Sequence, residues 1–288
     1  MAKLELREEI ISADLADHVM HGDPDKAVLR GVNISIKPGQ LVVIVGANGS
    51  GKSSLVKLLT RIYDPTGGAI LLDGTPLPAY RQRAFRRATA VLAQGHHLFP
   101  LSMGENIGLG HAARAYDVPA VRAAAAAGGA DACIAKLRGG LDAVLDPQAR
   151  ASGHNLVGRE GAALRRRLDA LDKPLALSGG ETQRIVAART FMRLKSGQVR
   201  AVLVDEPSSA LDAEGELALF DNLRAEREGK TMIFVTHRFG HLTKYADQIM
   251  CMKDGEVVER GVHDELMSLD GEYKKLYDIQ ASAFVAGT

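Results

Sequence analysis

A glycine-rich run that ends in a lysine and a serine is the part of this sequence best equipped for chemistry. Residues 46–53 match the pattern G-x-x-x-x-G-K-[ST], in which glycines let backbone N–H groups turn inward around a phosphate. The Lys52 ammonium would reach the β- and γ-phosphates of a nucleotide, and the Ser53 hydroxyl would be a ligand for Mg²⁺. The expected nucleotide-binding residues of this run are Gly46, Asn48, Gly49, Ser50, Gly51, Lys52, Ser53 and Ser54.

Two adjacent carboxylates provide a second chemical feature. Asp205 and Glu206 follow the aliphatic run at residues 201–204. Ligands of open α/β sheets bind at the carboxyl ends of the strands, and a buried strand would deliver both side chains to that edge. Asp205 would hold Mg²⁺ directly or through water, and Glu206 would polarise the attacking water. The alternative is that the pair only opens a surface turn before Pro207.

The elements that must position these residues follow from hydrophobic patterning. The aliphatic run at residues 41–45 is typical of a buried parallel strand, and an amphipathic helix is expected to begin near Lys52. A strand before the loop and a helix after it disfavour the alternative of a chance glycine loop that caps a helix. Further strands are expected at Val32–Ile36, 69–74, 201–204 and Thr231–Val235, and a helix over 214–227 with Leu217, Phe220 and Leu223 near one face.

The overall composition excludes several classes of protein. The 288 residues carry 36 Lys+Arg against 35 Asp+Glu, so no global field favours nucleic acid or an anionic membrane. The two cysteines, Cys133 and Cys251, cannot form a disulfide framework, which favours a reducing compartment. No apolar run approaches the ~20 residues that cross a bilayer, and the acidic N-terminus does not fit a signal peptide. We expect a cytoplasmic chain that does not insert directly into a membrane.

A third motif, Leu-Ser-Gly-Gly-Glu-Thr-Gln-Arg at residues 177–184, precedes the strand that ends at Asp205. Together with Gln94, residues 209–212 and His237, it resembles the nucleotide-binding domain of ATP-binding cassette (ABC) proteins, with every motif in family order. The resemblance implies an α/β fold with a P-loop NTPase (RecA-like) core and a mixed β-sheet over residues 1–94 and 190–288, and an inserted α-helical subdomain over residues 95–189. It also implies ATP and Mg²⁺ as cofactors and a head-to-tail dimer, either a homodimer or a heterodimer with another cassette.

The resemblance also assigns roles to individual residues. Gln94 would contact Mg²⁺ and the attacking water, and His237 would contact the γ-phosphate; with Glu206 they form the expected catalytic set. Asp212 belongs to the D-loop, which would cross the dimer interface. The residues that would face the ATP bound by a second cassette are Ser178, Gly179, Gly180 and Glu181. Their chemistry fits, because a hydroxyl, unhindered N–H groups and a helix N-terminus favour an anion, although alone they would indicate a plain helix cap.

Further segments resemble exporter-type cassettes, namely residues 105–107, 246–249, 255–266 and 271–280. In full exporters such a cassette follows six membrane helices, so the expected partner is a transmembrane domain or subunit at the cytoplasmic face of a membrane. The alternatives are a soluble ABC ATPase that acts on a macromolecule and a nucleotide-gated interaction module. A single phosphate loop and a near-zero net charge disfavour the first alternative, and the intact Lys52 and Glu206 disfavour the second.

Two features depart from the exporter pattern. His21 stands where exporters carry an aromatic residue that stacks on adenine, and imidazole offers less stacking area than tyrosine. Residues 146–176 separate the stretch 142–145 from the motif at residues 177–184, called the signature below. In exporters the chain runs almost directly from one to the other. Because leucines recur at helical spacing in this insertion, we expect a surface elaboration with a short amphipathic helix, outside the nucleotide site.

Overall fold

A computed structural model describes residues 11–15, 18–19, 27–93, 95, 97–145, 177–207, 210–238 and 240–286. These residues divide into two compact units. The first unit takes its residues from 1–94, 196–209 and 213–288, and the second from 95–195 and 210–212. Within the described ranges, every helix is too short or too polar to span a lipid bilayer.

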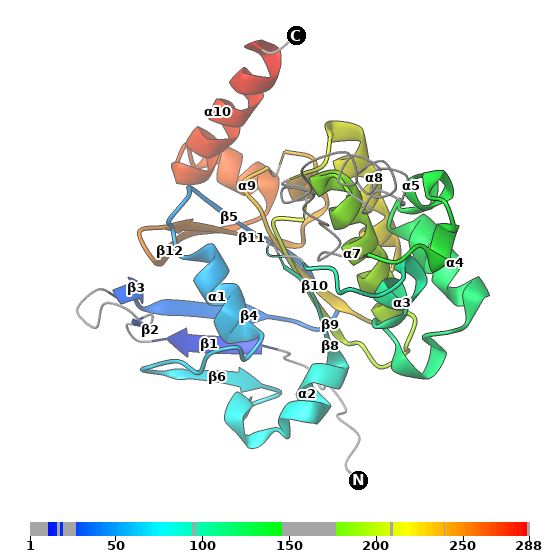
Figure 1. The fold of residues 1–288 in the computed structure, drawn as a ribbon. Coiled ribbons are helices and arrows are strands. Elements are labelled where there is room, and N and C mark those ends of the chain that lie inside the picture. Colours follow the sequence, from blue (N-terminus) through cyan, green and yellow to red (C-terminus); the bar gives the residue numbers. More distant parts are fainter. Residues whose placement is uncertain are drawn as a thin grey trace, which may run out of the picture. The chain divides into compact units, whose positions relative to one another are not determined.

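Aliphatic strands form the main sheet of the first unit (Figure 1). Its strands are β5 (Leu41–Gly46), β8 (Thr89–Leu92), β9 (Ala201–Asp205), β10 (Thr231–Val235), β11 (Gln248–Lys253) and β12 (Glu256–Gly261). Their order is β12-β11-β5-β10-β9-β8, with β12 antiparallel to β11 and the other neighbours parallel. Every residue of β5, β9 and β10 is buried, as expected for parallel strands that are covered on both faces. The predicted α/β fold with a mixed sheet is confirmed.

A smaller antiparallel sheet contributes its apolar face to the same core. Its order is β4-β1-β6-β7, formed by β1 (Ile11–Leu15), β4 (Val32–Ile36), β6 (Ala69–Leu72) and β7 (Thr75–Pro76). Buried and exposed residues alternate along β4, so that Val32, Ile34 and Ile36 join the core cluster that also contains Val42 and Ile44 of β5. A separate ribbon pairs β2 (His18–Val19) with β3 (Ala27–Leu29).

Helices complete the first unit: α1 (Lys52–Leu59), α2 (Gln82–Ala88), α8 (Ala213–Ala225), α9 (His263–Ser268) and α10 (Glu272–Ala286). The predicted helix start at Lys52 is confirmed, and α1 buries Leu55, Val56, Leu58 and Leu59. The expected face of α8 was wrong in one position. Leu217 is 41% exposed, and the buried stripe is Leu219, Phe220 and Leu223. Phe220 packs edge-on against Phe234 of β10, with ring centroids 5.7 Å apart, and this contact orients the helix with Leu217 in solvent.

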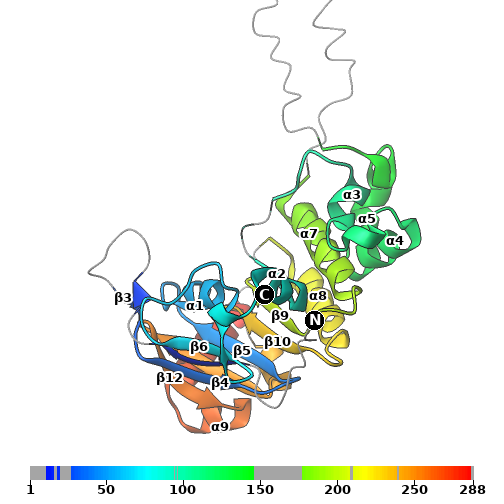
Figure 2. The same ribbon diagram turned by 90° about the horizontal axis from the view of Figure 1, so that it is seen from below.

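The longer regular elements described in the second unit are helices (Figure 2). Its helices are α3 (Met103–Gly108), α4 (Val118–Ala127), α5 (Asp131–Lys136) and α7 (Gly179–Leu194). Small residues allow α4 and α7 to approach closely, since a Cβ on Gly128 would lie 2.4 Å from the Ala188 nitrogen. Because α7 runs to Leu194, the helical unit continues past residue 189.

Candidate functional site

The predicted phosphate loop, residues 46–53, connects the end of β5 to the start of α1. Gly46 has a φ of +155°, and a Cβ there would lie 2.4 Å from the main-chain oxygen of Met252. Gly51 has a φ of +99°, and a Cβ there would lie 2.7 Å from Cδ2 of Leu29. Both positions therefore require glycine unless their neighbours shift. The resulting backbone lies at the N-terminus of α1, where free N–H groups and the helix dipole favour an anion.

Lys52 places a buried cation inside this loop. Its side chain is 5% exposed, and Nζ donates hydrogen bonds to the carbonyl oxygens of Gly46 and Ala47, each at 2.8 Å. Burial lowers the pKa of Lys52, and the negative charges of Glu206 and Asp205 oppose that shift. A phosphate at the loop would therefore meet a poorly hydrated ammonium, which interacts more strongly with an anion than a solvated one does.

Ser53 and Asp205 bring two oxygen atoms together beside the loop. The Ser53 hydroxyl donates to Oδ1 of Asp205 at 3.4 Å, from the first turn of α1 to the carboxyl end of β9. Burial raises the pKa of Asp205, while the Ser53 hydrogen bond and Lys52 act in the opposite direction. The described residues contain no group of three or more His, Cys, Asp or Glu that could hold a metal. A hydroxyl and one carboxylate, completed by water and phosphate oxygens, are the donors that suit Mg²⁺.

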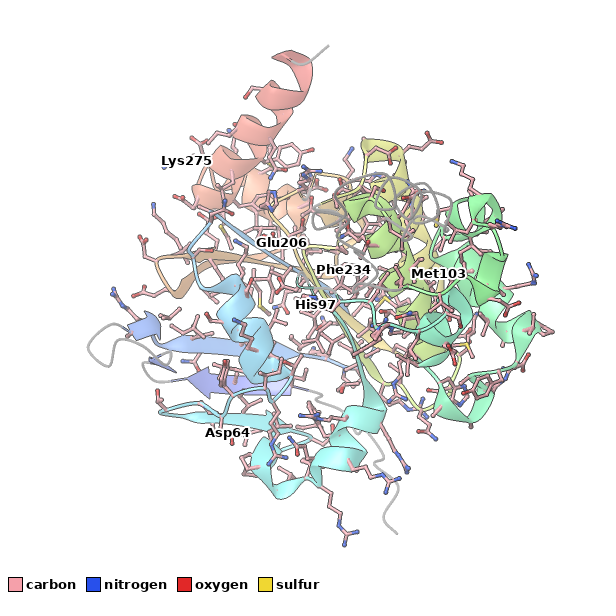
Figure 3. The ribbon with its side chains drawn as sticks, viewed as in Figure 1. Asp64, His97, Met103, Glu206, Phe234 and Lys275 are labelled. Atoms are coloured by element: carbon pink, nitrogen blue, oxygen red, sulfur yellow. The ribbon has the colours of Figure 1, made fainter. Side chains whose placement is uncertain are left out.

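Glu206 and His237 form a contact at the carboxyl ends of β9 and β10. Figure 3 labels Glu206. Glu206 has a φ of +47°, and its N–H donates to the Val235 carbonyl at 2.8 Å. This turn directs the side chain so that Oε1 lies 3.1 Å from Nδ1 of His237. The Glu206 side chain is 12% exposed and the His237 side chain 42%. Because Val235 pairs with Asp205 across the two strands, the carboxylates and the imidazole share one edge of the sheet.

The signature residues form the start of α7 in the second unit. Ser178 caps the helix: its Oγ accepts from the Glu181 N–H at 3.2 Å, and Oε2 of Glu181 accepts from the Ser178 N–H at 2.9 Å. The backbone hydrogen bond from Ser178 is the main reason that the pKa of Glu181 lies below its ordinary value. Gly179 and Gly180 form the first helical turn and carry no side chains that would cover its N–H groups. This turn has the geometry of a helix N-terminus that favours an anion.

Comparison with known proteins identifies the family. The sequence profile described as ABC transporter matches residues 29–209. The chain belongs to the ABC transporter family. An ATP-dependent lipid A-core flippase of Sodalis glossinidius is 36% identical over 94% of this chain and 42% of the relative, and one of Haemophilus ducreyi is 36% identical over 90% and 39%. The structure of a bacterial Atm1-family ABC exporter with ATP bound matches 96% of this chain and 43% of that chain, with 30% identity and a TM-score of 0.77.

These matches indicate which part of the ABC relatives this chain corresponds to. Over most of its length it is similar to the ABC domain of exporter-type proteins. It spans about two fifths of the length of the curated relatives it matches, 42% and 39% for the two flippases.

The structure places the remaining predicted residues of the ABC motifs as follows. Asn48 and Gly49 are exposed in the phosphate loop, Ser50 is buried there, and Ser54 lies in the first turn of α1. Asp212 lies in the second unit with its side chain 71% exposed, and Oδ1 is 3.4 Å from the Arg184 guanidinium. His21, Gln94 and residues 146–176 lie outside the described residues, so their predicted roles stay predictions.

Sequence reasoning assigned no role to two glutamines that contact motif residues. Gln280 of α10 donates from Nε2 to the main-chain oxygen of His237. Gln183 of α7 accepts a hydrogen bond from the N–H of Ala210, two residues before Asp212. The first contact joins residues 43 positions apart in the sequence and the second joins residues 27 positions apart. No local sequence pattern could therefore predict either contact.

Proposed function

We propose that this chain hydrolyses ATP with Mg²⁺ as part of a head-to-tail dimer of cassettes, and that hydrolysis drives export through a transmembrane domain or subunit. The observation that carries the proposal is the convergence of Lys52, Asp205, Glu206 and His237 at one edge of the main sheet. That edge combines a buried cation for phosphates, a carboxylate for the metal and a glutamate–histidine pair for proton transfer. The two compact units are then the nucleotide-binding core and the helical subdomain of one ABC ATPase domain.

Each residue of this edge has a separate task in the proposed reaction. The loop N–H groups and Lys52 bind the β- and γ-phosphates, while Ser53 and Asp205 hold the metal beside them. Mg²⁺ held by Ser53 and Asp205 would supply positive charge to neutralise the charge that develops on the transferred phosphoryl group. Glu206 accepts a proton from the attacking water, because its carboxylate lies at the strand end beside the metal ligand. His237 holds the Glu206 carboxylate through the 3.1 Å contact, and in this scheme it would also contact the γ-phosphate.

Residues from a second cassette complete the proposed site. The signature turn, residues 178–181, would offer its N–H groups and the Ser178 hydroxyl to the ATP of the partner cassette. Asp212 would cross the interface. Gln94 would contact the metal and the water, and His21 would stack on adenine. Either an identical chain or a different cassette would satisfy these requirements. Neither nucleic acid nor direct membrane insertion has a role in this scheme.

Coupling to export is supported by the relatives. Those from Sodalis glossinidius and Haemophilus ducreyi are called ATP-dependent lipid A-core flippases, and the matched solved structure is an ABC exporter. This chain spans about two fifths of those relatives. The transmembrane domain or subunit of the proposed assembly would lie outside these 288 residues, with the chain at the cytoplasmic face of the membrane. The test is genetic: a membrane-spanning segment encoded in the same frame or in an adjacent gene supports the proposal, and the absence of both contradicts it.

The dependence of ATPase activity on chain concentration tests the dimer. With saturating ATP and Mg²⁺, the rate per chain should rise with chain concentration, because two chains form each composite site and the wild-type dimer lasts only until its ATP is hydrolysed. Replacing Mg²⁺ by a chelator should abolish turnover at every concentration. A rate per chain that is constant over a hundredfold range, with the chain monomeric throughout, would contradict the composite site.

A further inference from the structure

The segment 210–212 packs on the first turns of α7 inside the second unit. A Cβ on Gly180 would lie 2.8 Å from the Ala210 carbonyl oxygen, and one on Gly179 would lie 3.4 Å from Cβ of Ala210. Glycines at both positions let the segment approach the helix backbone closely. Leu211 is buried, and its Cδ2 lies 4.0 Å from the same Gly180 position. The signature turn and the D-loop of one chain thus share a packed contact.

Gln183 supplies the hydrogen bond that fixes this contact. Its side chain faces inward at 3% exposure, and Oε1 accepts from the Ala210 N–H at 3.0 Å. Ala210 is itself exposed, so packing around its side chain does little to hold it. The acceptor on Gln183 therefore determines where the backbone of residue 210 lies relative to the signature turn. This role differs from that of Ser178 and Glu181, whose hydrogen bonds close on their own helix turn.

The neighbouring ion pair is the weaker link. Arg184 and Asp212 are 3.4 Å apart, but their side chains are 33% and 71% exposed. Solvent screens such pairs, and they stabilise little. The buried amide acceptor is thus the stronger restraint on the D-loop, and it is the one to test.

We propose that Gln183 is a positioning residue that holds the D-loop in register with the signature turn, so that both meet the second cassette as one surface. The inference rests on the proposed function, because it requires the dimer in which these two segments face the partner's ATP. Gln183 acts only through Ala210 in this role. Removal of its acceptor should leave ATP binding at the chain's own phosphate loop intact and should weaken closure of the dimer.

Hydrogen exchange tests the positioning in the monomer. Gln183→Met keeps the length and the apolar packing of the side chain and removes the acceptor. Gln183→Asn keeps an amide but is one methylene too short to reach Ala210. Exchange in the peptide that contains Ala210 and Leu211 should become about 10-fold faster in either variant, and exchange in β9 should not change. The control is Gln198→Met, at an exposed position, which should match the wild type. Unchanged exchange at Ala210 in both Gln183 variants would overturn the proposal.

Dimer formation tests the consequence. In a Glu206→Gln background with ATP and Mg²⁺, adding Gln183→Met should raise the dissociation constant of the dimer about 10-fold or more, measured by light scattering over a concentration series. Gln183→Glu, which keeps an acceptor oxygen, should recover most of the loss, and Gln198→Met should have no effect. Titration of dilute monomer with a fluorescent ATP analogue should give the same affinity for all variants.

The outcomes separate this inference from the proposed function. If the Glu206→Gln parent dimerises with ATP and Gln183→Met dimerises equally tightly, the positioning role is wrong. If Gln183→Met also weakens nucleotide binding by the monomer, the residue is a general support of the fold and the proposal is overturned. If the parent stays monomeric at every concentration, the proposed dimer is wrong and the inference falls with it.

Discussion

Alanine at position 51 tests whether the phosphate loop needs the backbone that the structure gives it. At a φ of +99°, an L-residue costs roughly 1–2 kcal/mol. The new Cβ would also lie 2.7 Å from Cδ2 of Leu29 and 3.2 Å from the carbonyl oxygen of Val28. Leu29 is fully buried, so its methyl group cannot move without repacking the core, and overpacking of this kind costs ~1–3 kcal/mol. Gly51→Ala should therefore lower the free energy of unfolding by about 2–5 kcal/mol.

A matched variant separates strain from contact. Gly39 has a φ of +73°, and a Cβ there would meet nothing within 4 Å, so Gly39→Ala should cost only the backbone term of roughly 1–2 kcal/mol. Urea unfolding of the wild type and both variants gives the two free-energy losses, and their difference measures the contact with Leu29 and Val28. ATP titration should show weaker binding for Gly51→Ala and unchanged binding for Gly39→Ala. Equal losses for both variants, with full ATP affinity in Gly51→Ala, would refute the reasoning.

Three further predictions concern single side chains. Lys52→Ala should abolish ATP binding because the one buried ammonium described in the loop is lost. Undiminished affinity in a nucleotide titration would show that the loop does not bind the phosphates. His21→Ala should weaken ATP binding by ~1 kcal/mol and His21→Tyr should restore it. Equal ATP affinities of the wild type and both variants would show that His21 does not stack on adenine. Burial raises the pKa of Cys251 from 9.0 to about 12, so a thiol reagent at pH 8 should find about 1000-fold less thiolate in the folded chain than in urea. Since the unfolded thiol ionises first, Cys251 should make the free energy of unfolding fall as pH rises from 9 towards 12, a slope that Cys251→Ala should reduce.

Elements with a strong local pattern were predictable. The all-aliphatic runs that form β5, β9 and β10 predict buried strands from their composition alone. The alternation of apolar and polar residues in β4 predicts a strand with one buried face. The start of α1 at Lys52 followed from the glycine loop before it. The buried face of α8 was not fully predictable, because Leu217 and Leu219 are equally apolar and only the packing of Phe220 on Phe234 selects between them.

Contacts made by tertiary structure were beyond the sequence pattern. Neither the length nor the polarity of Gln183 distinguishes it from the exposed Gln198, and its partner Ala210 lies 27 residues away. The contact of Gln280 with His237 spans 43 residues and depends on where α10 docks. The left-handed φ of Glu206, which directs its carboxylate to His237, is likewise a property of the folded strand end. The motifs located the residues, and the folded chain determined how their side chains are oriented.

The Glu206→Gln variant, with wild type as its control, tests the central claim most directly. The substitution keeps the shape of the side chain and removes the carboxylate that would accept a proton from water. Hydrolysis should fall by about 10²-fold or more, as expected for loss of a general base, while ATP binding persists. At high chain concentration with ATP and Mg²⁺, size-exclusion chromatography with light scattering should then show the variant at about twice the chain mass and the wild type largely as a monomer. A monomeric variant that hydrolyses ATP at the wild-type rate would contradict the account.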